Sequence, residues 1–329
     1  MDIELVAEGL RFPEGPIAMN DGSVIFTEIA GQRLTRVTPD GKTSVVAETG
    51  GGPNGAAIGP DGAIYVTNNG GSFEWMDTQG LLIPGPTPAS HVGGSIQRVD
   101  IATGKVETVY DSCDGKRLVG PNDLVFDKQG GMWFTDHGCT TPDGRKNGAL
   151  YYAKTDGSHI SRQRDHFISP NGVGLSPDEK VVYMADTNLG RLWAFDIAEP
   201  GVLAEPPPFQ PGRVVCNLPG FQLLDSLAVE AGGKVCVATI INGGITAFDP
   251  NGSTEPSFDR TRLRRPGRGL NGRLSQVLRP MITGLNIVTC LNRARSDLSR
   301  QGSLPPAPMT PLRPRATGPS AMGMVMAPD

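Results

Sequence analysis

Short runs of alternating apolar and polar residues recur along the first 255 residues. Five segments share one pattern, in which a turn is followed by a β-rich run, a second turn and a second run. These segments begin at Asn20, Pro60, Lys128, Pro177 and Ala231. Alternation such as that of Val24 with Phe26 is typical of strands. The NDG and PDG turns supply the positive φ angles that hairpins require.

This repeat predicts a β-propeller, because small antiparallel sheets that recur every ~40–50 residues must bury their faces against one another. A β-sandwich or an irregular all-β fold is the alternative. Gly (44) and Pro (29) together make up 73 of the 329 residues. Since both are unfavourable inside helices, a helical bundle is excluded.

One short polar motif accompanies each repeat: FPEGP, GPNGA, GPNDL, SPNGV and LLDSL. The polar residues at their centres are Glu14, Asn54, Asn122, Asn171 and Asp225. The innermost strands of a propeller line its central channel, so we expect these side chains to converge there. Carboxylate and amide oxygens suit a hard or borderline divalent cation. The motifs therefore predict a metal site, although Asn-Gly and Asn-Asp also occur simply as turns.

Four longer stretches add a further signal: RFPEGP, GKRLVGPNDLVFDKQGGMWFTD, ISPNGVGLSPDEKVVYMADT and LDSLAVEAGGKVCVA. In this order they resemble the gluconolactonase, luciferin-regenerating enzyme and senescence marker protein (regucalcin) family, over residues 5 to about 255. The resemblance implies a six-bladed propeller and one divalent cation in the channel: Ca²⁺, Mg²⁺, Mn²⁺, Zn²⁺ or Fe²⁺. It also implies hydrolysis of a lactone, typically a sugar lactone such as gluconolactone.

The resemblance also implies roles for individual residues. It makes Glu14, Asn122, Asn171 and Asp225 the metal ligands, with Asp225 also the catalytic base. The resemblance also makes Asn122 and Arg117 candidate substrate contacts. Asn54, Asp123 and His137 are further candidates because of their positions in the chain. Asp123 has a turn-capping role as its alternative, and His137 a surface or packing role. In place of the usual Pro-Asp-Gly around the base, this chain has Leu224-Asp225-Ser226.

Charge is distributed unevenly along the chain. Residues 259–329 carry twelve Arg, three Asp and no Lys or Glu, whereas residues 1–258 have a net charge of −13. The acidic body disfavours nucleic acid as a partner. We therefore divide the chain into a propeller of about five blades, 1–257, and a basic, Pro/Arg-rich tail, 258–329, predicted to be partly disordered.

The expected sixth blade is missing from this tail. Residues 259–329 contain no aromatic residue, and Arg without Lys alongside Pro, Gly, Ser and Ala is what an out-of-frame reading of a GC-rich gene yields. Our hypothesis is a frameshift near residues 255–260.

Targeting signals are not evident in the sequence. The start lacks a basic and apolar leader pattern, no run of eighteen apolar residues occurs, and the five cysteines are scattered. We predict a cytoplasmic protein with reduced thiols, no membrane partner and a small-molecule lactone as its partner. A non-catalytic metal-binding or interaction propeller is the alternative function.

Overall fold

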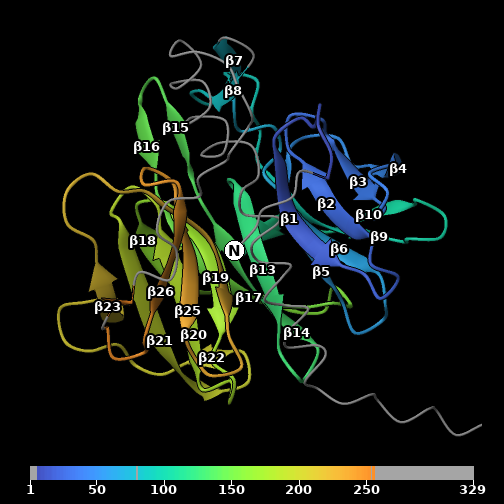
Figure 1. The fold of residues 1–329 in the computed structure, drawn as a ribbon. Coiled ribbons are helices and arrows are strands. Elements are labelled where there is room, and N and C mark those ends of the chain that lie inside the picture. Colours follow the sequence, from blue (N-terminus) through green and yellow to red (C-terminus); the bar gives the residue numbers. More distant parts are fainter. Residues whose placement is uncertain (1–5, 79–80, 253, 256–329) are drawn as a thin grey trace, which may run out of the picture.

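The computed structural model describes residues 6–78, 81–252 and 254–255, which form strands, turns and bends. Five antiparallel sheets follow one another around a common centre (Figure 1). This confirms an all-β propeller. The described residues form five blades, not the six that the family resemblance implies. Residues 256–329 lie outside the described part. The predicted domain boundary at 257/258, the missing sixth blade, the disordered tail and the frameshift therefore stay predictions.

Each blade contains four main strands that pair in sequence order. Blade 1 consists of β1 (Pro13–Ala18), β2 (Val24–Glu28), β3 (Arg33–Val37) and β4 (Thr43–Glu48). Blade 2 consists of β5 (Pro53–Ile58), β6 (Ile64–Asn68), β9 (Ser95–Val99) and β10 (Val106–Tyr110). Blade 3 consists of β13 (Pro121–Phe126), β14 (Gly131–Asp136), β17 (Gly148–Lys154) and β18 (Ile160–Phe167).

The last two blades follow the same plan. Blade 4 consists of β19 (Pro170–Leu175), β20 (Val181–Asp186), β21 (Arg191–Glu199) and β23 (Arg213–Asn217), with β22 (Val202–Leu203) also paired to β21. Blade 5 consists of β24 (Leu224–Val229), β25 (Val235–Thr239), β26 (Gly244–Phe248) and β27 (Thr254–Glu255). The first strands of successive blades contact one another, β1 with β5, β5 with β13, β13 with β19 and β19 with β24. These first strands are therefore the innermost.

The apolar core fills the interfaces between successive blades. Alternate residues of one strand serve two interfaces: in β6, Ile64 and Val66 pack toward blade 1, whereas Tyr65 packs toward blade 3. Trp133 of β14 likewise packs toward Trp193 of blade 4, and both tryptophans are core residues. Because each strand buries side chains on both faces, the blades can be stable only when stacked against neighbours.

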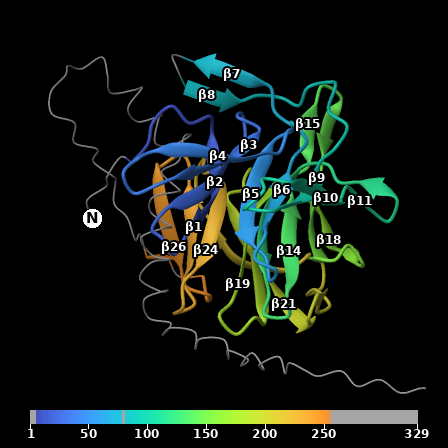
Figure 2. The same ribbon diagram turned by 90° about the vertical axis from the view of Figure 1, so that its right-hand side faces the viewer.

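Three short hairpins leave the blades. They are β7 (Trp75–Thr78) with β8 (Leu81–Pro84), β11 (Ser112–Cys113) with β12 (Lys116–Arg117), and β15 (Cys139–Thr141) with β16 (Gly144–Lys146). The hairpins β7–β8 and β15–β16 extend beyond the same end of the ring (Figures 1 and 2). A hydrogen bond of 3.0 Å from the Thr87 amide to the Thr140 carbonyl joins the segment after β8 to β15. Trp75 is half-buried in β7, outside the blades.

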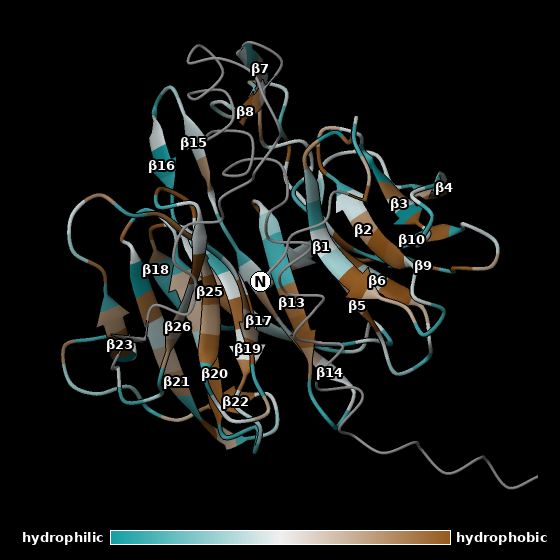
Figure 3. Ribbon diagram, viewed as in Figure 1, coloured by the Kyte–Doolittle hydropathy of each residue, from teal (hydrophilic) through white to brown (hydrophobic). Residues whose placement is uncertain are grey.

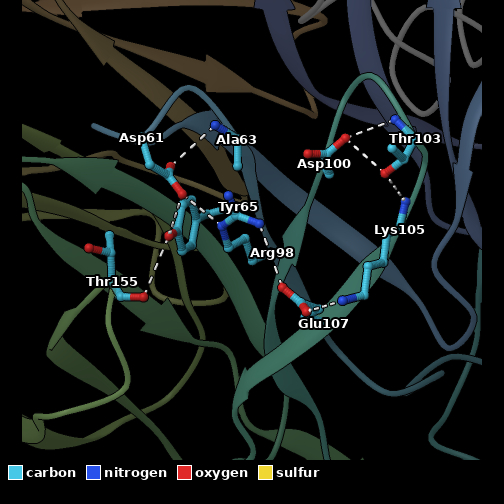
Figure 4. Close-up of polar contacts among 9 residues, drawn as sticks. All are labelled: Asp61, Ala63, Tyr65, Arg98, Asp100, Thr103, Lys105, Glu107 and Thr155. Carbon is cyan, nitrogen blue, oxygen red and sulfur yellow. Dashed lines mark hydrogen bonds and ion pairs between the residues drawn. The ribbon is translucent and has the colours of Figure 1, made fainter. Parts of the chain in front are cut away.

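At the opposite end of blade 2, polar side chains hold the turn between β5 and β6 (Figure 4). Asp61 accepts hydrogen bonds from the Ala63 amide at 3.2 Å and from Arg98 Nε at 2.7 Å. The Tyr65 hydroxyl lies 3.5 Å from the Thr155 carbonyl of blade 3. Since exposed ion pairs stabilise proteins little, these contacts mainly set the turn geometry.

Four cysteines fall within the described part of the chain, and all four, Cys113, Cys139, Cys216 and Cys236, are free thiols. Cys290 lies outside it. The described residues form no helix capable of crossing a membrane. The cytoplasmic location stays a prediction.

Candidate metal and active site

Each motif residue occupies the same place in its blade, at the start of the innermost strand. In all five blades the pairing with the second strand shifts by one residue at the motif residue or directly after it, as between Pro121 and Leu124 of β13. Such a β-bulge inserts one unpaired residue and redirects side chains locally. Figure 3 shows the start of β13 as hydrophilic and the rest of the strand as hydrophobic. The polar residues therefore gather at one end of the ring.

The glycine that follows a motif residue lets neighbouring innermost strands approach each other. A Cβ atom added at Gly55 would lie 2.7 Å from the Asn122 carbonyl oxygen, and one at Gly172 would lie 2.8 Å from the Asp225 carbonyl oxygen. Contacts this short are not tolerated between real Cβ atoms and backbone. The Asn-Gly pairs of the motifs therefore have a packing role besides turn formation.

Glu14 lies close to the carboxylates of blades 3 and 5. It is 7% exposed, and Ser226 Oγ donates a hydrogen bond of 3.3 Å to Glu14 Oε2, which joins blade 1 directly to blade 5. Burial, followed by repulsion from Asp225 and from Asp123, raises the pKa of Glu14 well above its usual value. Carboxylates that repel one another in a buried site are stabilised by a cation.

Asn122 has an unsatisfied oxygen in this region. Its side chain is 4% exposed, and its Oδ1 atom is buried without a hydrogen-bond partner. A buried polar atom without a partner costs about 1–3 kcal/mol, so such an atom in a native site calls for a ligand or an ordered solvent molecule. An amide oxygen is a suitable ligand for a divalent cation.

Asn171 is oriented by its own amide nitrogen. Nδ2 donates a hydrogen bond of 3.1 Å to Thr187 Oγ1, and the residue is 7% exposed. Because this bond engages the nitrogen, Oδ1 is the atom of Asn171 that can bind a cation. The described residues contain no group of three or more His, Cys, Asp and Glu side chains arranged for a metal. A cation here would therefore depend on the two asparagines as well as on Glu14 and Asp225.

Asp123 connects blade 3 to blade 4. Its Oδ2 accepts a hydrogen bond of 3.2 Å from the Val173 amide, and its Oδ1 accepts one of 2.9 Å from the Leu124 amide. Burial raises the pKa of Asp123 to about 7, with a further contribution from Asp225, although the two amide bonds act in the opposite direction. This carboxylate thus has a structural role, and its contact with a substrate stays a prediction.

His137 follows β14 directly and lies between two motif strands. Its backbone amide donates to the Gly120 carbonyl at 2.8 Å, and its Nδ1 lies 3.2 Å from the Pro170 carbonyl, which requires a proton on Nδ1. Burial, and then the charge of Arg145, lower the pKa of His137 to about 4. The imidazole is therefore neutral at physiological pH, with Nε2 as its acceptor atom.

Comparison with known proteins establishes the family. A family profile described as SMP-30/Gluconolactonase/LRE-like region matches residues 12–259. The chain belongs to this family. The resemblance inferred from the motifs is thereby confirmed.

Several named proteins resemble the chain at low sequence identity. A gluconolactonase of Zymomonas mobilis is 26% identical over 223 residues, which cover 61% of this chain and 56% of that protein. The chain thus aligns with little more than half the length of that relative. The lactonase drp35 of Staphylococcus saprophyticus is 25% identical over 299 residues, 90% of this chain and 82% of that protein. A solved gluconolactonase from Xanthomonas campestris has a TM-score of 0.58 at 24% identity, covering 74% of this chain and 75% of that one, which shows the shared fold.

Two further candidate substrate contacts are Arg117 and Asn54. Arg117 is exposed in β12, where its Nη1 lies 3.4 Å from Asp111 Oδ2. Asn54 is buried at the start of β5, and its backbone carbonyl accepts a hydrogen bond from Thr27. Substrate binding by either residue stays a prediction.

Sequence reasoning missed the residues that support these motifs. The second strands of the blades end in Glu28, Asn68, Asp136, Asp186 and Thr239. The side chains of the first four accept hydrogen bonds from backbone amides that lie just before the innermost strand of their own blade. Asp136, for example, accepts hydrogen bonds from the amides of Val119 and Gly120 at 2.7 and 2.8 Å. The signal was present in the repeats as FTE, VTN, FTD and MAD. Ser226, which departs from the family pattern, was also missed as a partner of Glu14.

Proposed function

We propose that this protein is a lactonase that depends on one divalent cation and opens the ester ring of a sugar (aldono)lactone such as gluconolactone. Membership of the family and the relatives named gluconolactonase and lactonase support lactone hydrolysis. The unsatisfied, buried oxygen of Asn122 at the end of the ring that holds Glu14 supports the cation. We infer that Glu14, Asn122, Asn171 and Asp225 hold this cation through oxygen atoms.

The chemistry follows from these groups. A bound divalent cation supplies positive charge for the oxygen that becomes negative when water attacks the lactone carbonyl. We infer that the Asp225 carboxylate accepts a proton from the attacking water as the new C–O bond forms. Asp225 then returns this proton to the ring oxygen as the ring C–O bond breaks. The product is a hydroxy acid, and Asp225 is restored as a carboxylate.

Removal of the cation tests the function directly. The purified protein is treated with EDTA, dialysed, and assayed by pH-stat on a panel of aldonolactones and simple lactones. We expect hydrolysis to be lost and then restored by Ca²⁺, Mn²⁺ or Zn²⁺. Hydrolysis that survives complete removal of metal contradicts the metal dependence. Metal binding without hydrolysis of any lactone indicates instead a non-catalytic metal-binding or interaction propeller.

Asn171→Ala is expected to weaken the affinity for the divalent cation by at least about tenfold, because it removes an oxygen ligand that no neighbouring group replaces. Isothermal titration calorimetry with MnCl₂ measures this affinity. Asn54→Ala is the matched control, because Asn54 occupies the same motif position in blade 2 but is not one of the four inferred metal ligands. Equal affinities in the wild type and Asn171→Ala remove Asn171 from the metal site.

A further inference from the structure

Three threonines occupy equivalent positions in successive blades. Thr27, Thr67 and Thr135 lie next to last in the second strands β2, β6 and β14, and each is 0% exposed. Each hydroxyl donates a hydrogen bond to the backbone carbonyl of the motif asparagine in the next blade. The Oγ1···O distances are 2.5 Å from Thr27 to Asn54, 2.5 Å from Thr67 to Asn122 and 2.6 Å from Thr135 to Asn171.

Two of these hydroxyls also accept a hydrogen bond within their own blade. Thr67 Oγ1 accepts from the Gly55 amide at 2.9 Å, and Thr135 Oγ1 accepts from the Asp123 amide at 3.1 Å. Gly55 and Asp123 are the bulge residues that follow the motif asparagines. Each of these two hydroxyls thus accepts a hydrogen bond from the bulge amide of its own blade and donates one to the motif asparagine of the next blade.

The series stops after blade 3. Ala185 and Ala238 occupy the corresponding positions of β20 and β25, and an alanine cannot donate a hydrogen bond. At the blade 4 to blade 5 junction Gly172 approaches Asp225 closely, as Gly55 approaches Asn122, but an alanine takes the place of the threonine. Among the inferred metal ligands, Asn122 and Asn171 are therefore the two whose backbone is held by a threonine hydroxyl.

We propose that Thr67 and Thr135 are positioning residues that set the spacing of the two asparagine ligands, Asn122 and Asn171, across the blade junctions. This proposal rests on the metal site of the proposed function. An asparagine side chain has only two rotatable bonds, so a shift of its backbone carbonyl moves Oδ1 almost directly. Residues that orient metal ligands typically change metal affinity 10–100-fold when they are replaced.

Three matched substitutions test this role. Thr→Val keeps the side-chain volume and removes the hydroxyl, so Thr27→Val, Thr67→Val and Thr135→Val each delete one bond between blades. Each variant is titrated with MnCl₂ by calorimetry, and the melting temperature of each is measured without metal. We expect all three metal-free variants to melt at lower temperature than the wild type, because each leaves a buried carbonyl without its partner.

Metal affinity separates positioning from general stability. We expect Thr67→Val and Thr135→Val to bind Mn²⁺ at least about tenfold more weakly than the wild type. Thr27→Val should bind Mn²⁺ within twofold of the wild type. Thr135→Ser retains the hydroxyl and should recover the affinity. Equal losses in all three valine variants, or no loss in Thr67→Val and Thr135→Val, overturn the positioning role while leaving the metal site intact. A wild-type protein that binds neither Mn²⁺ nor Ca²⁺ overturns the metal site and this proposal together.

Discussion

Replacing Asp225 by asparagine is expected to lower kcat for lactone hydrolysis by more than ~100-fold at saturating metal. Asparagine has nearly the same shape as aspartate, but its amide cannot accept the proton of the attacking water, and loss of a general base typically costs 10²–10⁴-fold. Initial rates on gluconolactone at several metal concentrations separate this effect from weaker metal binding, because only the latter is corrected by added metal.

Ser226→Ala provides the matched control for this experiment. It changes the residue next to Asp225 and removes the 3.3 Å bond to Glu14, but it leaves the Asp225 carboxylate in place. We therefore expect Ser226→Ala to reduce kcat far less than Asp225→Asn does. Near-native kcat in a folded Asp225→Asn variant would leave Asp225 without a catalytic role.

Glu14→Gln is expected to have opposite effects on the metal-free and metal-loaded protein. The pKa of Glu14 is raised in the folded state, so its contribution to stability is present below its unfolded pKa and is lost as the pH rises through the folded value. As the pH rises without metal, ionisation of the buried Glu14 next to Asp225 and Asp123 becomes increasingly unfavourable for the folded state, and the neutral glutamine avoids this cost. The metal-free variant should therefore melt at higher temperature than the metal-free wild type, by about 2–4 °C for each kcal/mol of repulsion removed.

Added metal should reverse this order. A cation that binds the folded state raises the melting temperature of the wild type. Glu14→Gln lacks the carboxylate ligand, so the cation raises its melting temperature only slightly. Calorimetric scans at pH 4.5 and pH 8, with EDTA or with MnCl₂, check both effects, and the metal-free difference should be smaller at the lower pH. A variant that is less stable than the wild type at pH 8 without metal would contradict the repulsion inferred among these carboxylates.

The amino-acid sequence by itself determined the blades and the motif positions. Strand alternation and turn residues act over a few neighbours, so the NDG and PDG turns and runs such as Val235 with Val237 predict hairpins without knowledge of the rest of the chain. Because each motif begins an innermost strand, repetition alone indicated that Glu14, Asn122 and Asn171 share one end of the ring. The family followed from the same motifs.

Only the tertiary structure decided which groups contact one another across the blade junctions. Ser226 donates to Glu14 across 212 residues of sequence, and Thr67 donates to Asn122 across 55. Such a bond depends on the close stacking of two blades, and no local pattern encodes the distance between them. The same holds for the raised pKa of Asp123, which arises from burial and from Asp225 of blade 5. Propensities act between neighbours in sequence, whereas hydrogen bonds and charges act between neighbours in space, and the propeller brings the two ends of its described chain together.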